Sequence, residues 1–576
     1  TKDYFFSHCA LGHTRLSIID LVSGTQPMLS RDKTVGLVFN GEIYSYKDIK
    51  KNIHAYPFVT HSDTEVILAL YEKYGTELLN DLPGMFAFGI YDQNKDWLFG
   101  ARDRFGEKPF YYAYGRNGEF IFASEIKAIL ATNLVKPIVS KLSLQHYLKH
   151  LYIHPYQTIY ENIYTLPPAH YLIYKNKQLI IKRYWSPPAT NNEISLDEAI
   201  PQFQQLLAKA VKQQLVSDVP IGCFLSGGLD SSTIVALASQ YKSNINTFTL
   251  NFNKGRSEVS YAQEVSDKYH TKHTVLQDND YNIAELITKM QSVYDEPFAD
   301  SSNIPTYLIS QLAKKYVTVA LTGDGCDELL AGYGWYKSLF YMQNQTRKEI
   351  WKLPILHMIA MVTRRIKTKQ YQHWSHRHQG LRERNTNFSL LEAHYKKNTY
   401  FTPDDFNNLK FPMLTENNHI MSWHLTDTVD DALRMDIENY MPGDILVKTD
   451  RAAMANSLEL RSPFLDVAFA SFCISLPYQL KITNDSEKYI LRKAFNDKWP
   501  PSVQTRAKQG FGAPVDQWLQ LPEVADLTKK YLKDKKRKIF EIMPFEACQK
   551  YVPVANYHTW ILLTLSMWME THDFTF

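Results

Sequence analysis

The chain has 576 residues, of which 44% are hydrophobic and 22% charged, and its net charge is +4 at pH 7. This length predicts two or three domains, and so small a charge excludes proteins that bind nucleic acid or acidic lipid through overall charge. The five cysteines are scattered without zinc-ligand spacing, which indicates free thiols in the reducing cytoplasm. No apolar run is long enough to cross a bilayer and no signal peptide is recognisable, so we expect no membrane partner.

The first 185 residues consist mainly of short runs of aromatic and β-branched residues, separated by Gly, Asp and Asn. Such runs are typical of antiparallel sheet. A helical pattern is clear at Thr64–Gly75. We therefore expect an α+β half in which one sheet packs on another. The segment Ser186–Ala199 is rich in Pro, Asn and Ser and predicts a linker between domains.

From residue 200 onward, apolar runs alternate with helical patterns, and from Tyr333 to the end helical patterns dominate. The alternation predicts βαβ units and a doubly wound, parallel α/β sheet with a helical C-terminal part. A stretch rich in Lys, Arg and His at residues 364–384 favours a solvated helical face over a helix lying on a membrane.

One strand in this half ends in the loop SGGLDSS, Ser226–Ser232, which leads into a predicted helix. Ligands bind at the carboxyl ends of parallel strands, and glycines, amides and hydroxyls at a helix N-terminus suit phosphate. The lysine of the ordinary phosphate loop is missing here, whereas Asp230 would repel phosphate unless a cation lay between them. Asp230 therefore predicts Mg²⁺, which prefers carboxylate and phosphate oxygens.

A second loop of similar character, LTGDGCDELLAGY, follows another predicted strand and carries Asp324 and Asp327. Asp230 and Asp327 could share one magnesium ion. Either loop alone is equally typical of a capped helix after a tight turn. Two acidic loops, each at a strand end, favour a nucleotide site.

These two loops, together with DEPFADSSNIPTYLIS, KTDRAAMANSLELRSPFLD and RAKQGFGAPVDQWL, resemble the glutamine-hydrolysing asparagine synthetases. The resemblance implies an ATP-pyrophosphatase domain, in which aspartate attacks ATP to form β-aspartyl-AMP and pyrophosphate, and ammonia then displaces AMP. It implies metal ligation by Asp230 and Asp327 and catalytic roles for Asp324 and Lys508. Aspartate at 324 is one methylene shorter than the glutamate of some synthetases. The implied ATP-binding residues are Leu225, Ser226, Gly227, Gly228, Asp230, Ser231, Ser232, Leu250, Thr322 and Gly323.

Five further charged residues fall within the same motifs. Asp295 and Glu296 precede a proline in a loop, so we expect them near the site without assigning them a role. Arg451, Glu459 and Arg461 are expected to form a buried frame of ion pairs rather than to take part in the chemistry.

The N-terminal half carries GHTRLSIIDL, VFNGEIYSY, HSDTEVIL and LFGARDRFGEKPFYY, and it resembles a class II glutamine amidotransferase domain. The resemblance implies an N-terminal-nucleophile hydrolase sandwich with αββα layers. Arg15 and Asp63 would bind the α-carboxylate and α-amine of glutamine, and Asn40 and Gly41 would form the oxyanion hole. Two local alternatives remain: Asn-Gly is also a turn signal, and Ser-Asp-Thr-Glu is also a helix cap.

The nucleophile of that family is a cysteine at the mature N-terminus, whose own α-amine acts as the base. No such cysteine opens this sequence, and neither Thr1 nor Cys9, which lies within a strand pattern, matches its position. We therefore expect the first strands and the nucleophile to lie outside this chain. The chain as given should then make amide from ammonia but not from glutamine, and its sheet should have an uncovered edge.

The expected organisation is an amidotransferase domain at 1–185, a linker at 186–199 and a synthetase domain at 200–576. Aspartate, ATP, and glutamine or ammonia are the expected partners, with no nucleic acid; a homodimer stays open. One alternative keeps the chemistry but changes the acceptor to another carboxylate, as in polysaccharide or secondary-metabolite pathways. The other alternative is a non-catalytic relative that acts by binding.

Overall fold

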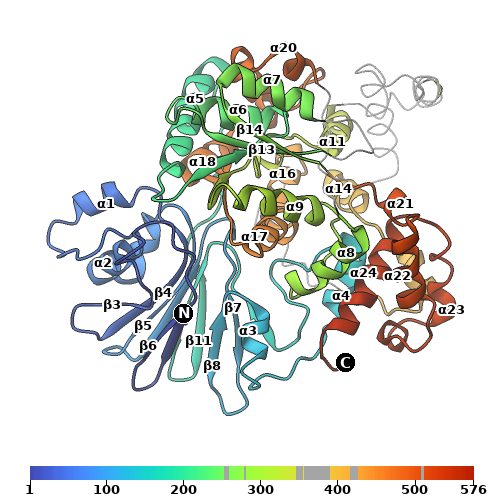
Figure 1. The fold of residues 1–576 in the computed structure, drawn as a ribbon, viewed down its shortest axis with the longest axis horizontal. Coiled ribbons are helices and arrows are strands. Elements are labelled where there is room, and N and C mark those ends of the chain that lie inside the picture. Colours follow the sequence, from blue (N-terminus) through green and yellow to red (C-terminus); the bar gives the residue numbers. More distant parts are fainter. Residues whose placement is uncertain are drawn as a thin grey trace.

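The computed structural model describes residues 1–251, 258–277, 281–344, 355, 358, 389–415, 426–506 and 512–576. Lys508 and the basic stretch at 364–384 lie outside the described residues. The chain forms two halves that pack against each other, with the antiparallel strands of the N-terminal half at the lower left of Figure 1 and the parallel sheet above them.

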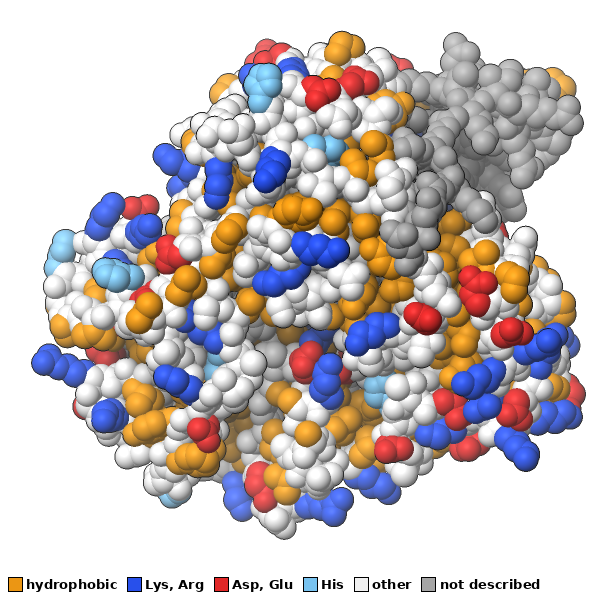
Figure 2. Space-filling view, viewed as in Figure 1, with side chains coloured by type: hydrophobic (Ala, Val, Ile, Leu, Met, Phe, Trp, Pro, Cys, Tyr) orange, Lys and Arg blue, Asp and Glu red, His pale blue; other side chains and the backbone are white. Residues whose placement is uncertain are grey.

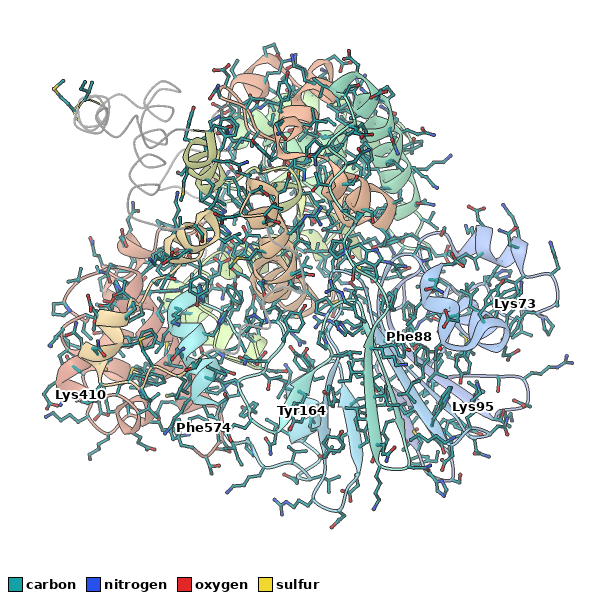
Figure 3. The ribbon with its side chains drawn as sticks, turned by 180° about the vertical axis from the view of Figure 1, so that it is seen from behind. Lys73, Phe88, Lys95, Tyr164, Lys410 and Phe574 are labelled. Atoms are coloured by element: carbon teal, nitrogen blue, oxygen red, sulfur yellow. The ribbon has the colours of Figure 1, made fainter. Side chains whose placement is uncertain are left out.

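The N-terminal half contains a six-stranded antiparallel sheet in the order β11-β10-β6-β5-β4-β3, a three-stranded antiparallel sheet β8-β7-β9, and the hairpin β1-β2. Every residue of β5, MFAFGIYD, is buried, so this strand is covered on both faces. Phe88 of β5 lies inside the half, whereas Lys73 and Lys95 lie on its outer surface (Figure 3). The elements are β1 (Lys2–Phe5), β2 (Ala10–His13), β3 (Met28–Leu29), β4 (Val35–Glu42), α1 (Tyr46–Asn52), α2 (Thr64–Tyr74), β5 (Met85–Asp92), β6 (Trp97–Arg102), β7 (Tyr111–Tyr114), β8 (Phe120–Ala123), α3 (Ile126–Leu130), α4 (Lys141–His150), β9 (Ile163–Thr165), β10 (His170–Lys175) and β11 (Gln178–Arg183).

The C-terminal half is built on a five-stranded parallel sheet in the order β14-β13-β12-β15-β16. Figure 1 shows α5, α6 and α7 on one side of this sheet and α9 and α17 on the other. The elements up to the second loop are α5 (Leu196–Gln214), β12 (Ile221–Phe224), α6 (Leu229–Ala238), β13 (Asn246–Asn251), α7 (Val259–Tyr269), β14 (Lys272–Gln277), α8 (Ile283–Val293), α9 (Asn303–Lys314), β15 (Val319–Leu321) and α10 (Cys326–Leu329). The chain runs outward from β12 to β13 and β14 and then returns to place β15 on the other side of β12, so the strand order reverses between β12 and β15. Ligands bind at such a switch point in open α/β sheets.

Helices make up most of the remaining described chain, as the sequence predicts. They are α11 (Gly334–Asn344), α14 (Leu390–Lys397), α15 (Pro403–Leu409), α16 (Val429–Glu438), α17 (Leu446–Met454), α18 (Val467–Ser475), α19 (Tyr489–Phe495), α20 (Pro501–Thr505), α21 (Val515–Trp518), α22 (Pro522–Leu532), α23 (Phe545–Cys548) and α24 (Tyr557–Thr571), with strand β16 (Glu459–Arg461) between α17 and α18. A π-helical turn, η4 (Met441–Ile445), joins α16 to α17.

The segment that includes α3 and α4 belongs to the first 185 residues of the chain but packs among the C-terminal helices (Figure 1). Tyr147 of α4 is fully buried, and its hydroxyl donates to the carbonyl of Ile561 in α24 at 2.9 Å. The backbone N–H of Ala299 donates to the carbonyl of Leu151 at 2.8 Å. One hydrophobic core therefore contains residues from both sides of the expected domain boundary.

The helix α5 begins at Leu196, inside the segment Ser186–Ala199 that we expected to be a linker. Ser195 caps this helix: its hydroxyl accepts from the N–H of Glu198, whose carboxylate in turn accepts from the N–H of Ser195. The sequence Ser-Leu-Asp-Glu is a capping box, so this helix start could have been predicted.

Three further sequence predictions concern the whole molecule. All five cysteines are free, as predicted. Within the described ranges, no helix is long and apolar enough to cross a membrane. Charged side chains of both signs are interspersed over the face shown in Figure 2, in keeping with the small net charge.

Candidate functional site

The first predicted loop lies directly after β12 and leads into α6. Gly227 has a left-handed backbone (φ 67°), and a Cβ there would lie 2.5 Å from Cβ of Tyr261, so both the conformation and the close approach require glycine. The hydroxyls of Ser226 and Ser231 lie 3.1 Å apart, and Ser226 accepts from the N–H of Gly228. The loop therefore gathers hydroxyls and amides at a helix N-terminus.

Three predicted ATP residues in or beside this loop are buried rather than presented at its surface. Ser232 is fully buried, and its hydroxyl has no hydrogen-bond partner. Leu225 and Leu250 are also buried, and the N–H of Leu225 donates to the carbonyl of Phe248. Both leucines thus belong to the floor beneath the loop.

The second predicted loop follows β15, the strand that pairs directly with β12. Gly323 touches the first loop, because a Cβ at this position would lie 2.9 Å from Cβ of Asp230. The N–H of Thr322 donates to the carbonyl of Arg461, and its hydroxyl lies 3.0 Å from that of Ser462. The structure thus brings the two loops together at the strand-order reversal, as the sequence predicts.

A lysine that the sequence interpretation did not single out lies between the two loops. Lys488 Nζ is 2.6 Å from both carboxylate oxygens of Asp230 and 2.6 Å from Asp327 Oδ1. Burial alone would lower the pKa of Lys488, but these two carboxylates raise it well above its usual value. The ammonium is therefore charged, and it occupies the position between the carboxylates where we expected magnesium.

The backbone of Lys488 is left-handed (φ 53°) directly before α19, a conformation that costs energy for a residue with a side chain. A Cβ at Gly332 would lie 2.2 Å from Cε of Lys488 and 1.9 Å from Asp327 Oδ1. Gly332 therefore leaves the room that the ion pair needs. A lysine in the segment SEKYILR gives no local signal of this role, because only the fold brings it to the loops.

Asp324 is half-buried in the same loop, close to Thr322 and Thr449. Burial raises the pKa of Asp324, and the nearby ammonium of Lys448 opposes that effect. Lys508 lies outside the described residues, but Arg506, two residues before it, donates to the carbonyl of Ser226 at 2.8 Å. The start of the RAKQGFG segment therefore contacts the first loop.

The predicted glutamine residues gather at the end of β4. Asn40 and Gly41 lie within this strand rather than in a turn, so the turn interpretation of Asn-Gly is wrong. Gly41 has φ 146°, and a Cβ would lie 2.1 Å from the carbonyl oxygen of Met85, which permits only glycine. A backbone N–H near a strand end is the kind of donor that an oxyanion hole uses.

Asp63 and Arg15 lie close to this strand end. Asp63 is at the N-cap position of α2 but makes no capping hydrogen bond with its side chain, which instead accepts from the N–H of Ile43 at 3.0 Å. Burial raises the pKa of Asp63 to about 6, although the Ile43 N–H opposes this. Partial burial lowers the pKa of Arg15, and Asp63 is the strongest charge that opposes the effect. The carboxylate and the guanidinium thus interact electrostatically, while the guanidinium donates to the carbonyls of Ile19 and Asp20.

Burial raises the pKa of the Cys9 thiol to about 12, so this cysteine is not a reactive thiolate. This agrees with its exclusion as the nucleophile.

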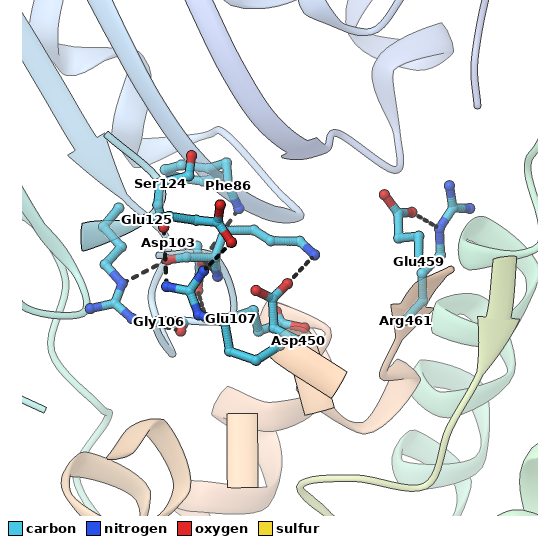
Figure 4. Close-up of polar contacts among 12 residues, drawn as sticks. Phe86, Asp103, Gly106, Glu107, Ser124, Glu125, Asp450, Glu459 and Arg461 are labelled. Carbon is cyan, nitrogen blue, oxygen red and sulfur yellow. Dashed lines mark hydrogen bonds and ion pairs between the residues drawn. The ribbon is translucent and has the colours of Figure 1, made fainter. Parts of the chain in front are cut away.

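The two halves are joined by buried ion pairs, some of which are drawn in Figure 4. Arg461 lies within 2.8 Å of Glu459 and 3.1 Å of Glu42, the residue after Gly41. Lys108 pairs with Asp450 at 2.9 Å. The remaining bonds of this frame run from Arg451 to Glu125, Ser124 and Tyr111. The frame predicted for Arg451, Glu459 and Arg461 is therefore present, and it connects the glutamine residues to the strand beside the nucleotide loops.

Asp295 and Glu296 also act at this junction. Asp295 accepts from the N–H of Ile126 at 2.6 Å, and Glu296 accepts from the N–H of Ile159 at 2.6 Å. Both carboxylates come from the C-terminal half and hold the backbone of the first 185 residues. Their place is thus at the junction between the halves.

The junction should make stability depend on pH through Glu296. Burial raises its pKa to about 7 from an ordinary value of 4.5, so ionising it in the folded protein is unfavourable. Its contribution to stability is present below pH 4.5 and is lost as the pH rises to 7. Glu296→Gln keeps an acceptor for the N–H of Ile159. At pH 8 it should raise the free energy of unfolding by at most about 3 kcal/mol, and with it the Tm, whereas at pH 5 it should change neither. Thermal unfolding at both pH values checks this, with exposed Glu193→Gln as the control; equal effects at both pH values would contradict it.

The structure thus has two sites. One is a pair of phosphate-type loops on the parallel sheet, and the other is the Asn-Gly strand end of the antiparallel sheet, with Asp63 and Arg15 beside it. Together they define a two-site enzyme of the amidotransferase–ligase class. The glutamine amidotransferase domain family matches residues 2–185 and the asparagine synthase family matches residues 202–570. The chain belongs to the asparagine synthase family, in the enzyme class of glutamine-hydrolysing asparagine synthases.

Two named asparagine synthetases are similar to this chain. Glutamine-hydrolyzing asparagine synthetase 1 of Bacillus subtilis (strain 168) is 35% identical over 532 residues, which cover 89% of this chain and 81% of the relative. Glutamine-hydrolyzing asparagine synthetase 2 of Arabidopsis thaliana is 33% identical over 360 residues, covering 60% of this chain and 56% of the relative. A solved glutamine phosphoribosylpyrophosphate amidotransferase from B. subtilis shares 16% identity, covers 43% of this chain and 48% of its own, and has a TM-score of 0.22.

The fold class predicted from the sequence is confirmed: an amidotransferase sandwich, a parallel synthetase sheet and a helical C-terminal part. The division at 185 and 200 and the roles of the individual site residues stay predictions.

Proposed function

We propose that this chain activates the side-chain carboxylate of aspartate with ATP and converts it into the amide with ammonia, which glutamine hydrolysis supplies at the second site. The observation that carries the proposal is the meeting of the two loops at the strand-order reversal, with Asp230 and Asp327 facing each other across Lys488. Free thiols suit a reducing compartment, so we place the reaction in the cytoplasm.

In the first step, a carboxylate oxygen of the acceptor attacks the α-phosphorus of ATP. The bond from that phosphorus to the bridging oxygen breaks, and pyrophosphate leaves with the electron pair. The Ser226 and Ser231 hydroxyls and the amides before α6 would donate hydrogen bonds to its oxygens. In the second step, ammonia attacks the acyl carbon, AMP leaves, and one ammonia proton must be removed. Asp324, in the second loop, is our candidate for holding the reacting groups in place.

Magnesium would have to share Asp230 and Asp327 with the Lys488 ammonium, which lies 2.6 Å from both carboxylates. Among the residues described, no group of three or more His, Cys, Asp or Glu side chains could hold a metal by itself, so phosphate oxygens would have to complete the coordination. Asp230 and Asp327 would be its protein ligands, and the ion would neutralise charge on the departing pyrophosphate. Because Lys488 already cancels one of their two negative charges, the cluster would present one net negative charge to the metal–nucleotide complex.

A panel of carboxylic acids tests the proposal. We expect pyrophosphate release from ATP and Mg²⁺ to rise when aspartate is added and to rise much less with glutamate, succinate or uronic acids. With ammonium present, asparagine should accumulate in equal amount to pyrophosphate. If only a different acid stimulates pyrophosphate release, that acid replaces aspartate as the proposed acceptor. If no acid stimulates it, the proposed activity is overturned.

A further inference from the structure

A cavity of about 340 Å³ lies behind the second loop, within the size range of small-molecule sites. It is enclosed by α4, α14, α16, the turn η4 and the segments that start α9 and α11. Its lining is aromatic, histidine-bearing and acidic, and the residues that the argument uses are His146, Tyr152, Asp300, Trp335, Tyr440 and Asp444.

Lys448 connects this cavity to the nucleotide loops. Its ammonium lies 3.5 Å from Asp300 Oδ2, in the cavity wall. Burial alone would lower the pKa of Lys448, but Asp300, Asp444 and Asp324 together raise it. The same lysine therefore links Asp300 in the cavity wall to Asp324, so the cavity lies near the loop where the carboxylate would react.

One carboxylate of the wall has an unfilled bonding position. Asp444 is 2% exposed, and its Oδ1 has no hydrogen-bond partner. By contrast, Asp300 accepts from the N–H and the hydroxyl of Ser302, and Asp436 accepts from Tyr336 and pairs with His394. A buried oxygen without a partner costs free energy unless a ligand supplies a donor.

The backbone around Asp444 is also unusual. Asp444 sits on the π-helical turn η4, in the sequence Met-Pro-Gly-Asp-Ile. Pro442 has no N–H for a regular helix, and a Cβ at Gly443 would lie 2.6 Å from the ring of Tyr152. Such single π turns occur often at functional sites, and this one aims a carboxylate at the cavity.

Burial and the neighbouring Asp300 raise the pKa of Asp444 well above its usual value, so a bound cation would be needed to stabilise its ionised form. The other groups of the lining used here do not oppose a cation at this oxygen, although Lys397 also lines the cavity. Burial lowers the pKa of His146 well below its usual value, and the neighbouring histidines add to this, so the imidazole is neutral and does not repel a cation. Trp335, Tyr152 and Tyr440 add aromatic faces and edges, which suit a desolvated ammonium. The cavity thus offers an acid, neutral histidine and aromatic rings to one buried point.

We propose that this cavity is the acceptor subsite and that Asp444, supported by Asp300, binds the α-ammonium of the amino-acid acceptor. The proposal rests on the proposed function and adds the residue that would distinguish an amino acid from a plain dicarboxylic acid. Succinate has the carbon chain and both carboxylates of aspartate but lacks the ammonium, so it should not fill the position at Asp444 Oδ1.

The test compares pyrophosphate release with aspartate and with succinate in the wild type and in Asp444→Asn. We expect Asp444→Asn to lower kcat/KM for aspartate by about 10- to 100-fold, the range for a lost hydrogen bond to a charged group. The rate with succinate and the KM for ATP should stay unchanged, so the preference for aspartate should fall. Unchanged preference in the variant, or a wild type that does not prefer aspartate, would overturn the assignment.

Asp430→Asn is the matched control. Asp430, on α16, is another buried acid, but it pairs with Lys481 and lies outside the cavity wall. It should alter Tm without altering the preference between acids. If no acid supports turnover, the proposed function fails. Calorimetric titration with aspartate and succinate then still tests the subsite, because binding can be measured without a reaction. Tighter binding of aspartate than of succinate, lost in Asp444→Asn, would support the assignment.

Discussion

Lys488→Met should reduce pyrophosphate release by about 1,000-fold or more, and it should also lower the Tm of the protein. The substitution leaves the buried carboxylates of Asp230 and Asp327 facing each other without their shared cation. Breaking a buried ion pair in this way costs about 3–5 kcal/mol. The two loops that the lysine joins should then separate, and the nucleotide would lose its preformed cradle. Thermal unfolding and the pyrophosphate assay measure the two effects separately.

Lys481→Met is the control, because Lys481 is an equally buried lysine seven residues earlier and pairs with Asp430, away from the loops. It should lower Tm and leave pyrophosphate release largely intact. In Lys488→Met, Mg²⁺ should raise Tm more than in the wild type, since a cation is missing between two potential ligands. If Lys488→Met keeps normal pyrophosphate release, the ion pair is not needed for the nucleotide site.

Asn40→Ala should reduce glutamine hydrolysis by about 100- to 1,000-fold, the usual loss for one oxyanion-hole donor. The assay uses protein that carries the N-terminal cysteine of class II amidotransferases. Ammonia-dependent synthesis should be unaffected, because the nucleotide loops lie on the other sheet. The two rates are measured with glutamine and with ammonium as the sole nitrogen donor.

Exposed Asn117→Ala, in the turn between β7 and β8, serves as the comparison and should change neither rate. Equal loss of both activities in Asn40→Ala would show that Asn40 supports the fold of β4 and not the oxyanion.

Much of the architecture could be predicted because its signals are local. Alternating aromatic runs predicted the antiparallel sheets, and apolar runs followed by helical patterns predicted the parallel sheet. The two nucleotide loops were predictable for the same reason: glycines and acids directly after a strand have few other uses. Gly227, in the first of these loops, agrees with this, since its position excludes any side chain.

What could not be predicted depends on contacts between distant segments. Lys488 lies 258 positions from Asp230 in the chain, and nothing in SEKYILR shows that its ammonium would stand where we expected a metal ion. Asp444 likewise looks like an ordinary helix acid until Pro442 forces the π turn. The roles of Asp295 and Glu296 became clear only when their N–H donors on the other half were known.

The position of α4 has a consequence for how such an enzyme could evolve. This helix is encoded with the glutamine-using part, yet it fills the core of the synthetase part and supplies one wall of the acceptor cavity. A gene split at the linker would therefore leave the synthetase polypeptide with an exposed apolar groove and an open substrate pocket. Exchanging the glutamine-using part for that of a distant relative would alter acceptor choice as well as nitrogen supply. Shared packing thus keeps the two parts in one polypeptide, and neither part can be exchanged independently of the other.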